Sequence, residues 1–170
     1  MKIRRNLAVL LFVGLATAAC GQTGAPARVQ APADSAAGEV AFELAGPGGA
    51  ALVVPVYVNG QGPFRFVLDT GATLTCVDQQ IAARLELPQA RGVTGVGAGV
   101  GSSGRMEIVR VDSVRLGAAR AEELIACALD LQHIGSVGLE VDGLLGLNFL
   151  RAFRVTIDFE REILLLQEPT

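Results

Sequence analysis

The sequence lacks several kinds of residue that common functions require. It has no Trp, one His (His133) and three Cys in 170 residues. A single His, with no pair of Cys at ligand spacing, provides no set of metal ligands, so we expect no metal and no other cofactor. We expect His133 in a loop, and no nucleophile elbow indicates a Ser–His hydrolase.

An excess of basic charge is also missing. The 14 basic and 17 acidic side chains give a net charge of −3. This argues against nucleic acid as a partner, because proteins that bind it neutralise phosphates with a basic surface. With 51% hydrophobic and 18% charged residues, the chain is nevertheless expected to fold, and its length fits one domain of ordinary size.

Residues 1–20 have the pattern of a secretory signal peptide. Three basic residues among the first five precede an uncharged apolar run, Leu7–Ala19. As a helix this run is about 20 Å long, too short to cross a hydrocarbon core of about 30 Å. It ends in small residues before Cys20, which resembles the lipoprotein box of bacteria. We expect a lipid on Cys20 that anchors the protein in the cell envelope, facing the periplasm; the alternative is an ordinary signal peptide cut nearby.

Residues 21–38 and 39–170 differ in composition. The first stretch holds mainly Ala, Pro, Gly and polar residues without a periodic apolar pattern, which predicts a flexible tether. From Glu39 onward, apolar residues mostly alternate with polar ones, and Gly or Pro marks the turns. We therefore predict one all-β domain over residues 39–170, closed or barrel-like, with one or two short helices.

The same alternation places the elements of this domain. We expect a hairpin of Val53–Val58 and Phe64–Leu68 around the turn residues 59–63. Asp78 is a candidate N-cap for a short helix that runs to Leu85. Further strands are expected over Glu39–Leu44, Thr73–Val77, Arg105–Leu116, Ala121–Leu131, Leu144–Leu145, Val155–Phe159 and Ile163–Leu166, with a helical turn over Asn148–Phe153.

Two Cys remain once Cys20 is assigned to the lipid. Cys76 and Cys127 both lie in apolar, strand-like runs. An oxidising compartment permits a disulfide between them. Two Cys in such runs are more often independent core residues, and that is the prediction we favour.

A carboxylate at the end of an apolar strand is the sharpest feature of the chain. Phe66–Leu68 leads directly into Asp69, Thr70, Gly71 and Ala72. Burying a carboxylate is costly unless it is hydrogen-bonded or functional. Gly71 allows a tight turn whose N–H approaches the carboxylate, and the Thr70 hydroxyl is able to fix a neighbouring loop. The simpler alternative is that Asp69 only caps a turn.

Further motifs follow along the chain. A glycine-rich stretch covers Gly95–Gly101, and Leu144–Gly146 precedes the helical turn. Together with Asp69–Ala72 and the closing strand Arg154–Phe159, this order resembles the aspartic proteases, in particular the single-lobe, retroviral-protease-like branch called retropepsins. The resemblance covers about residues 50–160. It implies a single-lobe pepsin-like or retropepsin-like closed barrel.

The resemblance also implies a peptide hydrolase. Asp69 would be its catalytic carboxylate, supported by Thr70, Gly71 and Ala72. In this chemistry two carboxylates share one proton, and no metal or covalent nucleophile is needed. The flap over a peptide substrate would comprise Gly95, Val96, Gly97, Ala98 and Gly99, and the core of the active-site fold would comprise Leu144, Leu145 and Gly146.

The chain carries only one Asp-Thr-Gly. Asp142 and Asp158 lack the Thr-Gly context, and Asp142 is expected to mark a loop that enters an apolar strand. The simplest solution is a homodimer in which two copies of Asp69 meet at a two-fold axis. In retroviral enzymes the termini of the two subunits interleave. Here Glu162–Leu166 is expected to fold back as a hairpin within one chain, so the contact between subunits differs or is weak.

The glycine-rich stretch has an alternative interpretation. Gly99–Gly104 satisfies the dinucleotide-binding pattern G-x-G-x-x-G, but a strand is expected after it rather than the required helix. We favour a flap that opens at its glycines over a plain flexible hairpin.

For the activity, the alternative is a lipoprotein of the same fold that binds peptides or partner proteins without cleaving them.

Overall fold

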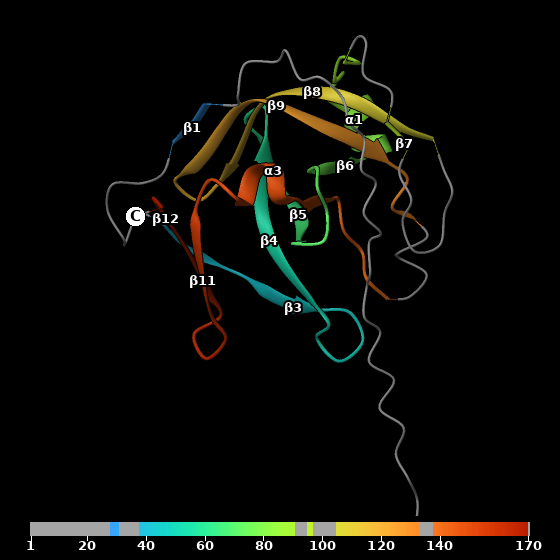
Figure 1. The fold of residues 1–170 in the computed structure, drawn as a ribbon. Helices are drawn as coiled ribbons and strands as arrows, with labels where there is room; N and C mark the ends of the chain where they lie inside the picture. Colours follow the sequence, from blue (N-terminus) through green and yellow to red (C-terminus); the bar gives the residue numbers. More distant parts are fainter. Residues whose placement is uncertain (1–27, 31–37, 91–94, 97–104, 133–137, 170) are drawn as a thin grey trace, which may run out of the picture.

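The computed structural model describes residues 28–30, 38–90, 95–96, 105–132 and 138–169. Strands dominate this part of the chain, and two short helices accompany them (Figure 1). No helix among these residues is long and apolar enough to span a membrane. The prediction of an all-β domain with short helices is confirmed.

Six strands pair in a closed ring. The hairpins β4–β5 and β8–β9 form most of it, and two three-residue strands, β6 and β10, complete it between β5 and β9. β4 also pairs with β8, which closes the ring in the predicted barrel-like way. The bounds are β4 (Ala51–Val58), β5 (Gln61–Leu68), β6 (Cys76–Asp78), β8 (Arg105–Leu116), β9 (Ala119–Leu129) and β10 (Gly143–Leu145).

β10 lies between β5 and β6. It runs parallel to β5 and antiparallel to β6, while β6 runs parallel to β9. Parallel neighbours need long crossover connections, so segments far apart in the sequence meet here. We call this arrangement of β5, β10 and β6 the strand crossing. It places Asp69, the residue after β5, beside the end of β10.

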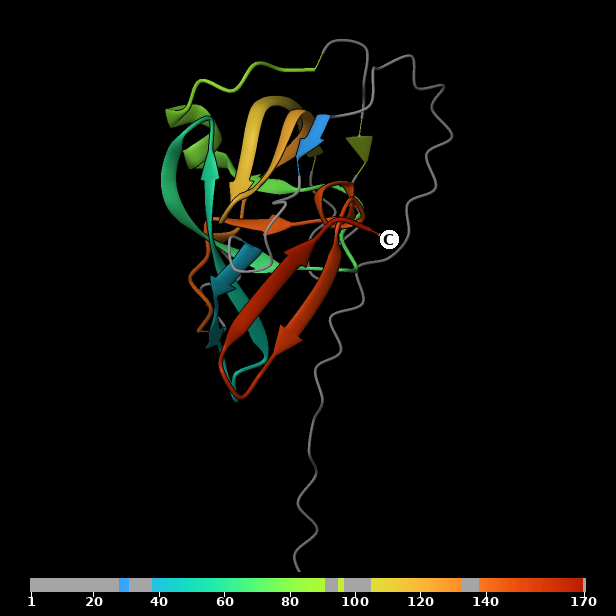
Figure 2. The ribbon, with the colours of Figure 1, turned by 90° about the vertical axis from the view of Figure 1, so that its left-hand side faces the viewer.

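A three-stranded antiparallel sheet lies beside the ring (Figure 2). Its order is β11 (Arg154–Asp158), β12 (Ile163–Gln167) and β2 (Glu39–Ala41). β11 and β12 form a hairpin within the chain, as predicted. Leu164 and Leu166 of β12 are fully buried and join this sheet to the core.

Both helices are short and begin within a residue of the predicted positions. α1 (Gln79–Arg84) has Asp78 as its N-cap, and the Asp78 side chain accepts a hydrogen bond from a first-turn N–H at 2.9 Å. The second Asp78 oxygen accepts from the Leu131 N–H at 3.2 Å. These two bonds explain how the Asp78 carboxylate is buried. α3 (Leu147–Leu150) follows β10 directly.

The main hydrophobic core combines residues of the ring strands, of both helices and of the small sheet. A smaller cluster beside it contains Cys76, Ala90, Ile108 and Cys127. Burying one large apolar side chain contributes about 1.5–3 kcal/mol. The largest fully buried side chains of the main core are Phe66, Phe149, Leu116, Leu124, Leu145, Leu164 and Leu166. β5 and β10, the two strands that meet beside Asp69, each supply one of these side chains, Phe66 and Leu145.

Two predicted strands differ from the structure. Glu39–Leu44 forms two strands, β2 and β3 (Glu43–Ala45), because the chain passes from the small sheet to the ring at the buried Phe42. The strand predicted over Thr73–Val77 begins only at Cys76. The backbone before Cys76 bonds to the start of α3 instead.

Residues 28–30 contradict a uniform tether over residues 21–38. They form β1 (Arg28–Gln30), which pairs antiparallel with Arg120–Glu122 of β9. β8 occupies one edge of β9 there, so the other edge leaves main-chain groups for β1. Main-chain pairing needs no apolar pattern, which is why composition did not reveal this strand. The rest of residues 21–38, apart from Gly38, lies outside the described residues.

Candidate active site

Asp69 directly follows β5 and is held by main-chain hydrogen bonds. Its N–H donates to the Leu145 carbonyl oxygen at 3.1 Å. Its side-chain Oδ1 accepts from the Gly71 N–H at 2.8 Å. The Ala72 N–H donates to the Asp69 carbonyl oxygen at 3.3 Å. The structure therefore has the tight turn expected at Gly71.

The second carboxylate oxygen of Asp69, Oδ2, is buried. It has no hydrogen-bond partner among the described residues, and no other buried side-chain N or O atom there shares this condition. Leaving such an atom unpaired costs about 1–3 kcal/mol, which calls for an explanation. A carboxylate that receives a substrate or a second carboxyl group provides one, whereas a residue that only caps a turn does not.

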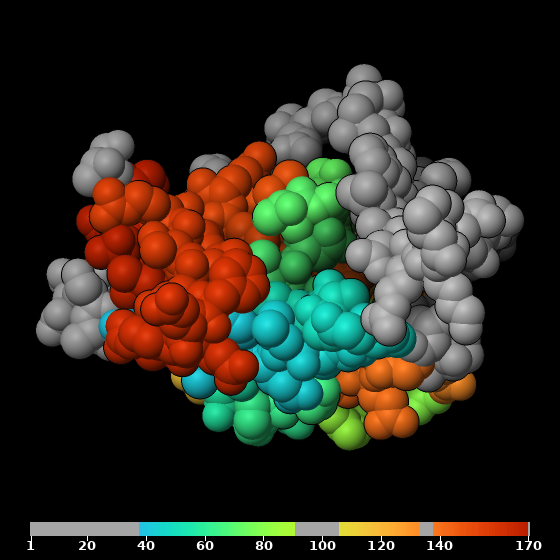
Figure 3. Space-filling model, turned by 90° about the horizontal axis from the view of Figure 1, so that it is seen from below, coloured from blue at the N-terminus to red at the C-terminus, as the bar shows by residue number. Residues whose placement is uncertain are grey.

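The loop from Asp69 to β6 lies against the start of α3. The Leu147 N–H donates to the Ala72 carbonyl oxygen at 2.8 Å, and the Asn148 N–H donates to the Thr73 carbonyl oxygen at 3.1 Å. Ala72 is buried, whereas residues 70 and 71 are exposed. In the view from below, this green loop reaches the surface next to the orange-red C-terminal segment (Figure 3).

Thr75 and Asn148 brace this loop, and neither was predicted as a site residue. The Asn148 Oδ1 accepts from the Thr75 N–H at 2.8 Å and from the Thr75 hydroxyl at 2.9 Å. The Thr75 hydroxyl oxygen in turn accepts from the Gly146 N–H at 3.2 Å. The Asn148 Nδ2 donates to the Ile125 carbonyl oxygen at 2.7 Å. Polar residues inside two apolar runs were the signal that could have identified them.

Leu144, Leu145 and Gly146 lie in the crossing, where the prediction placed the core of the site. Leu145 is fully buried in the main core, and Leu144 packs against the smaller cluster. A Cβ on Gly146 would collide with the Leu74 carbonyl group and lie 2.8 Å from the Thr75 nitrogen. Glycine at 146 is therefore required by the close approach of two backbone segments.

The structure describes only the base of the predicted flap. Gly95 and Val96 form β7 (Gly95–Val96), which pairs antiparallel with Arg105 and Met106 of β8. Gly97, Ala98 and Gly99 lie outside the described residues, as does His133. A strand follows the G-x-G-x-x-G pattern, so the helix needed for dinucleotide binding is not there, and that alternative is excluded.

Cys76 and Cys127 form a disulfide, so the prediction of two independent core Cys is wrong. The parallel pairing of β6 with β9 sets these two residues directly opposite each other, with their Cα atoms 4.4 Å apart. Disulfides bridge such a separation. The Cys127 N–H donates to the Thr75 carbonyl oxygen at 3.0 Å. The disulfide therefore adjoins the contacts of Thr75 that brace the Asp69 loop.

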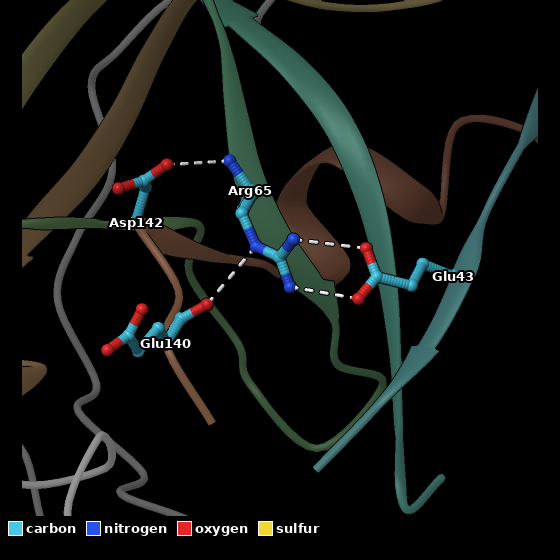
Figure 4. Close-up of polar contacts among 4 residues, drawn as sticks. All are labelled: Glu43, Arg65, Glu140 and Asp142. Atoms are coloured by element: carbon cyan, nitrogen blue, oxygen red, sulfur yellow. Dashed lines mark hydrogen bonds and ion pairs between the residues drawn. The ribbon is translucent and has the colours of Figure 1, made fainter. Parts of the chain in front are cut away.

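Asp142 and Asp158 both have structural partners. The Asp142 Oδ2 accepts from the Arg65 N–H at 2.7 Å, which confirms that Asp142 marks the loop before β10 (Figure 4). The Asp158 Oδ1 accepts from the N–H groups of Glu160 and Arg161, both at 3.0 Å, and so caps the turn after β11. In the described part of the chain, no three His, Cys, Asp or Glu residues are grouped to hold a metal ion.

The strand crossing and the Asp69 turn define a retropepsin-like aspartic protease fold. The chain is similar to the crystal structure of a retropepsin-like aspartic protease from Rickettsia conorii, with a TM-score of 0.53 and 20% identity. That match covers 84% of this chain and 95% of the other. It is also similar to the retroviral protease-like domain of Ddi1 from Leishmania major, with a TM-score of 0.45, 21% identity, and coverage of 71% and 94%.

The sequence profile of the aspartyl protease family matches residues 54–149, which is more than half of the chain. The chain therefore belongs to the aspartyl protease family, and the predicted resemblance is confirmed. A comparison with curated protein sequences gives no match.

Proposed function

We propose that this protein is an aspartic endopeptidase whose active site is completed by a second copy of the chain. Asp69 of each copy supplies one carboxyl group, and Thr70, Gly71 and Ala72 form the turn that holds it. The observation that supports this most strongly is the buried Oδ2 of Asp69, which has no partner among the described residues of one chain. A second carboxyl group at a two-fold axis gives this atom a partner.

The proposed chemistry is that of two carboxyl groups in contact. Like charges about 3 Å apart cannot both ionise, so the pair shares one proton. The ionised group takes a proton from water while the water oxygen bonds to the scissile carbonyl carbon, and the protonated group donates its proton to the carbonyl oxygen. Proton transfer to the amide nitrogen then breaks the C–N bond and leaves a new carboxyl and a new amino group. Oδ1 of Asp69 already accepts a hydrogen bond from the Gly71 N–H, so Oδ2 is the oxygen that takes part in these proton transfers.

An exposed edge strand supports the association of two copies. β11 is the edge of the small sheet, and among the described residues only β12 pairs with it. Edge strands are often blocked from pairing with another chain by Pro, a bulge or charged side chains. Arg154–Asp158 has no Pro and no bulge, and its charged residues lie only at its two ends. Figure 3 shows the orange-red C-terminal part of the chain on the same face as the green loop after Asp69.

The charges of β11 fit antiparallel pairing with a second copy. When Thr156 of each chain faces its counterpart, Arg154 of one chain lies opposite Asp158 of the other, at both ends of the pair. Ile157 and Phe159 are 37% and 61% exposed, and they add apolar surface that a partner covers. Each chain keeps its own hairpin, so the termini need not interleave.

We also propose that the protein is exported and anchored by a lipid on Cys20, with its domain acting on peptides or proteins at the periplasmic side. The Cys76–Cys127 disulfide supports export, because disulfides persist in oxidising compartments and are rare in the cytosol. A shared membrane surface raises the local concentration of chains and favours the dimer. Metabolic labelling with a radioactive fatty acid tests the anchor: label on the wild type but not on Cys20→Ser is expected, and equal labelling contradicts it.

The activity is tested by cleavage of an internally quenched peptide library between about pH 4 and pH 7, where carboxyl dyads operate. Asp69→Asn is expected to lower the rate by at least about 10²–10⁴-fold, since it removes an acid–base group. Asp112→Asn, the same change at an exposed residue of β8, is the control and keeps wild-type activity. A wild-type protein that binds the peptides without cleaving them favours the binding lipoprotein instead.

A further inference from the structure

Asp142 is the point at which three strands of the crossing are joined. The Asp142 N–H donates to the Arg65 carbonyl oxygen at 2.7 Å, and the Arg65 N–H donates to the Asp142 Oδ2 at 2.7 Å. On the other side, the Asp78 N–H donates to the Asp142 carbonyl oxygen at 2.7 Å. The residue directly before β10 is thus bonded to β5 through both its main chain and its side chain, and to the last residue of β6.

The Arg65 side chain reinforces the same contact from outside (Figure 4). Its Nε donates to the Glu140 carbonyl oxygen at 3.3 Å, and its two terminal nitrogens donate to the two oxygens of Glu43 at 3.0 and 3.1 Å. The Arg65 and Glu43 side chains are 49% and 57% exposed, so this ion pair adds little stability by itself. Its planar geometry nevertheless fixes the direction of the loop that leads to Asp142.

The position of β10 decides what lies beside Asp69. Gly143, Leu144 and Leu145 pair with Phe66, Val67 and Leu68 of β5 in that order. The next bond along this ladder runs from the Asp69 N–H to the Leu145 carbonyl oxygen. β10 has only three residues, so few main-chain bonds set its register, and a slip of one residue turns every side chain to the opposite face.

We propose that Asp142 is a positioning residue for catalysis: its carboxylate fixes the register of β10 against β5 and thereby holds the Asp69 main chain in place. Asp142 itself touches no reacting atom. The proposal rests on the proposed function of Asp69. It explains why a residue with a side-chain oxygen acceptor stands at this point, because that oxygen accepts the hydrogen bond from the Arg65 N–H of β5.

The test compares Asp142→Ala with Asp142→Asn in the full-length protein, using the best-cleaved peptide of the quenched library. Asn retains a side-chain oxygen that accepts from the Arg65 N–H, whereas Ala does not. Asp142→Ala is expected to lower kcat by about tenfold with KM within about twofold of wild type, and Asp142→Asn to stay within about threefold in kcat. Asp130→Ala is the control. The Asp130 side chain also accepts a main-chain N–H at 3.0 Å, but from Gln132 in its own exposed turn rather than from a distant strand, so its loss is expected to leave kcat unchanged.

Amide hydrogen exchange at Asp69 provides a readout that needs no activity. Asp142→Ala is expected to raise the exchange rate of the Asp69 N–H by about tenfold relative to Asp142→Asn and Asp130→Ala, because the bond to Leu145 opens more often. If Asp142→Ala does not fold, hydrogen exchange in the wild type tests the proposal instead. The Arg65 N–H bonds to Asp142 and the Asp69 N–H bonds to Leu145. If Asp142 fixes the register of β10, both bonds open together, and the protection factors of these two amides should agree within about threefold.

Distinct results separate failure of this proposal from failure of the proposed function. Wild-type kcat and wild-type exchange in Asp142→Ala overturn the positioning role, as does equal damage from Ala and Asn. Full activity of Asp69→Asn overturns the proposed function instead, and leaves the exchange result standing.

Discussion

The N–H of Asp69 donates a hydrogen bond to the carbonyl oxygen of Leu145 at 3.1 Å. The bond joins the residue after β5 to the last residue of β10, and β10 lies between β5 and β6. Two motifs that are distant in the sequence thus form one structural unit. Changes that disturb this crossing are expected to act on Asp69 without touching its side chain.

Thr75→Val is expected to lower the free energy of unfolding by about 1–3 kcal/mol. The Thr75 side chain is fully buried, and its hydroxyl accepts from the Gly146 N–H and donates to Asn148. Valine has the same shape but leaves both groups without their partner. Urea denaturation measures the change. Thr75→Ser keeps the hydroxyl and should cost only about 0.8 kcal/mol for the lost buried methyl group. The exposed Thr73→Val should stay within about 0.5 kcal/mol of wild type. A Thr75→Val protein as stable as wild type would show that this bond network contributes nothing.

Gly146→Ala is expected to destabilise the protein by about 1–3 kcal/mol, or to prevent folding. An added Cβ meets the backbone of Leu74 and Thr75 rather than a flexible side chain, so it can be accommodated only by moving β10 or the Asp69 loop. Thermal denaturation followed by circular dichroism gives the stability. A wild-type melting temperature would contradict the close approach of these two segments.

The Cys76–Cys127 disulfide is expected to contribute about 2–4 kcal/mol. It closes a loop with a sequence separation of 51, and such a loop restricts the unfolded chain substantially. Denaturation of Cys76→Ala/Cys127→Ala in urea should show this loss, and wild-type protein treated with dithiothreitol should approach the same midpoint. Two free thiols titrated in unreduced, unfolded protein would show that the bond does not form.

Arg154→Glu is expected to weaken the proposed dimer by about five- to thirtyfold. In the two-fold pairing of β11, this change sets two acidic residues opposite each other at both ends. Sedimentation velocity on the chain from Gly21 onward, in the Asp69→Asn background, measures association separately from activity. Arg110→Glu makes the same change in charge on an exposed residue of β8 and serves as the control. An Arg154→Glu protein that dimerises like the control excludes this pairing.

Local patterns were sufficient to predict most elements. Alternating side chains and turn residues act over a few positions, and they identified the β4–β5 hairpin, β8 and the β11–β12 hairpin. The N-cap of α1 was predicted for the same reason, because Asp78 bonds to an N–H only two residues away. Asp69 and the Leu144–Gly146 motif were also recognisable, since both lie in short apolar runs.

Pairings between distant segments could not be predicted in this way. The disulfide depends on the parallel pairing of β6 with β9, which nothing near Cys76 or Cys127 reveals. β1 pairs with β9 through main-chain groups, and the composition of its segment does not reveal this pairing. The contacts of Thr75 with Asn148 join residues that no local period relates. Each is decided by tertiary structure rather than by local propensity.

The most direct test of an active site shared by two chains is the activity of mixtures. At a concentration where the protein is fully dimeric, Asp69→Asn chains are mixed in about ninefold excess with wild-type chains and allowed to exchange subunits. Because only about one wild-type chain in ten then pairs with another wild-type chain, the activity per wild-type chain should fall about tenfold. Unchanged activity per wild-type chain would contradict a site that needs Asp69 from both copies.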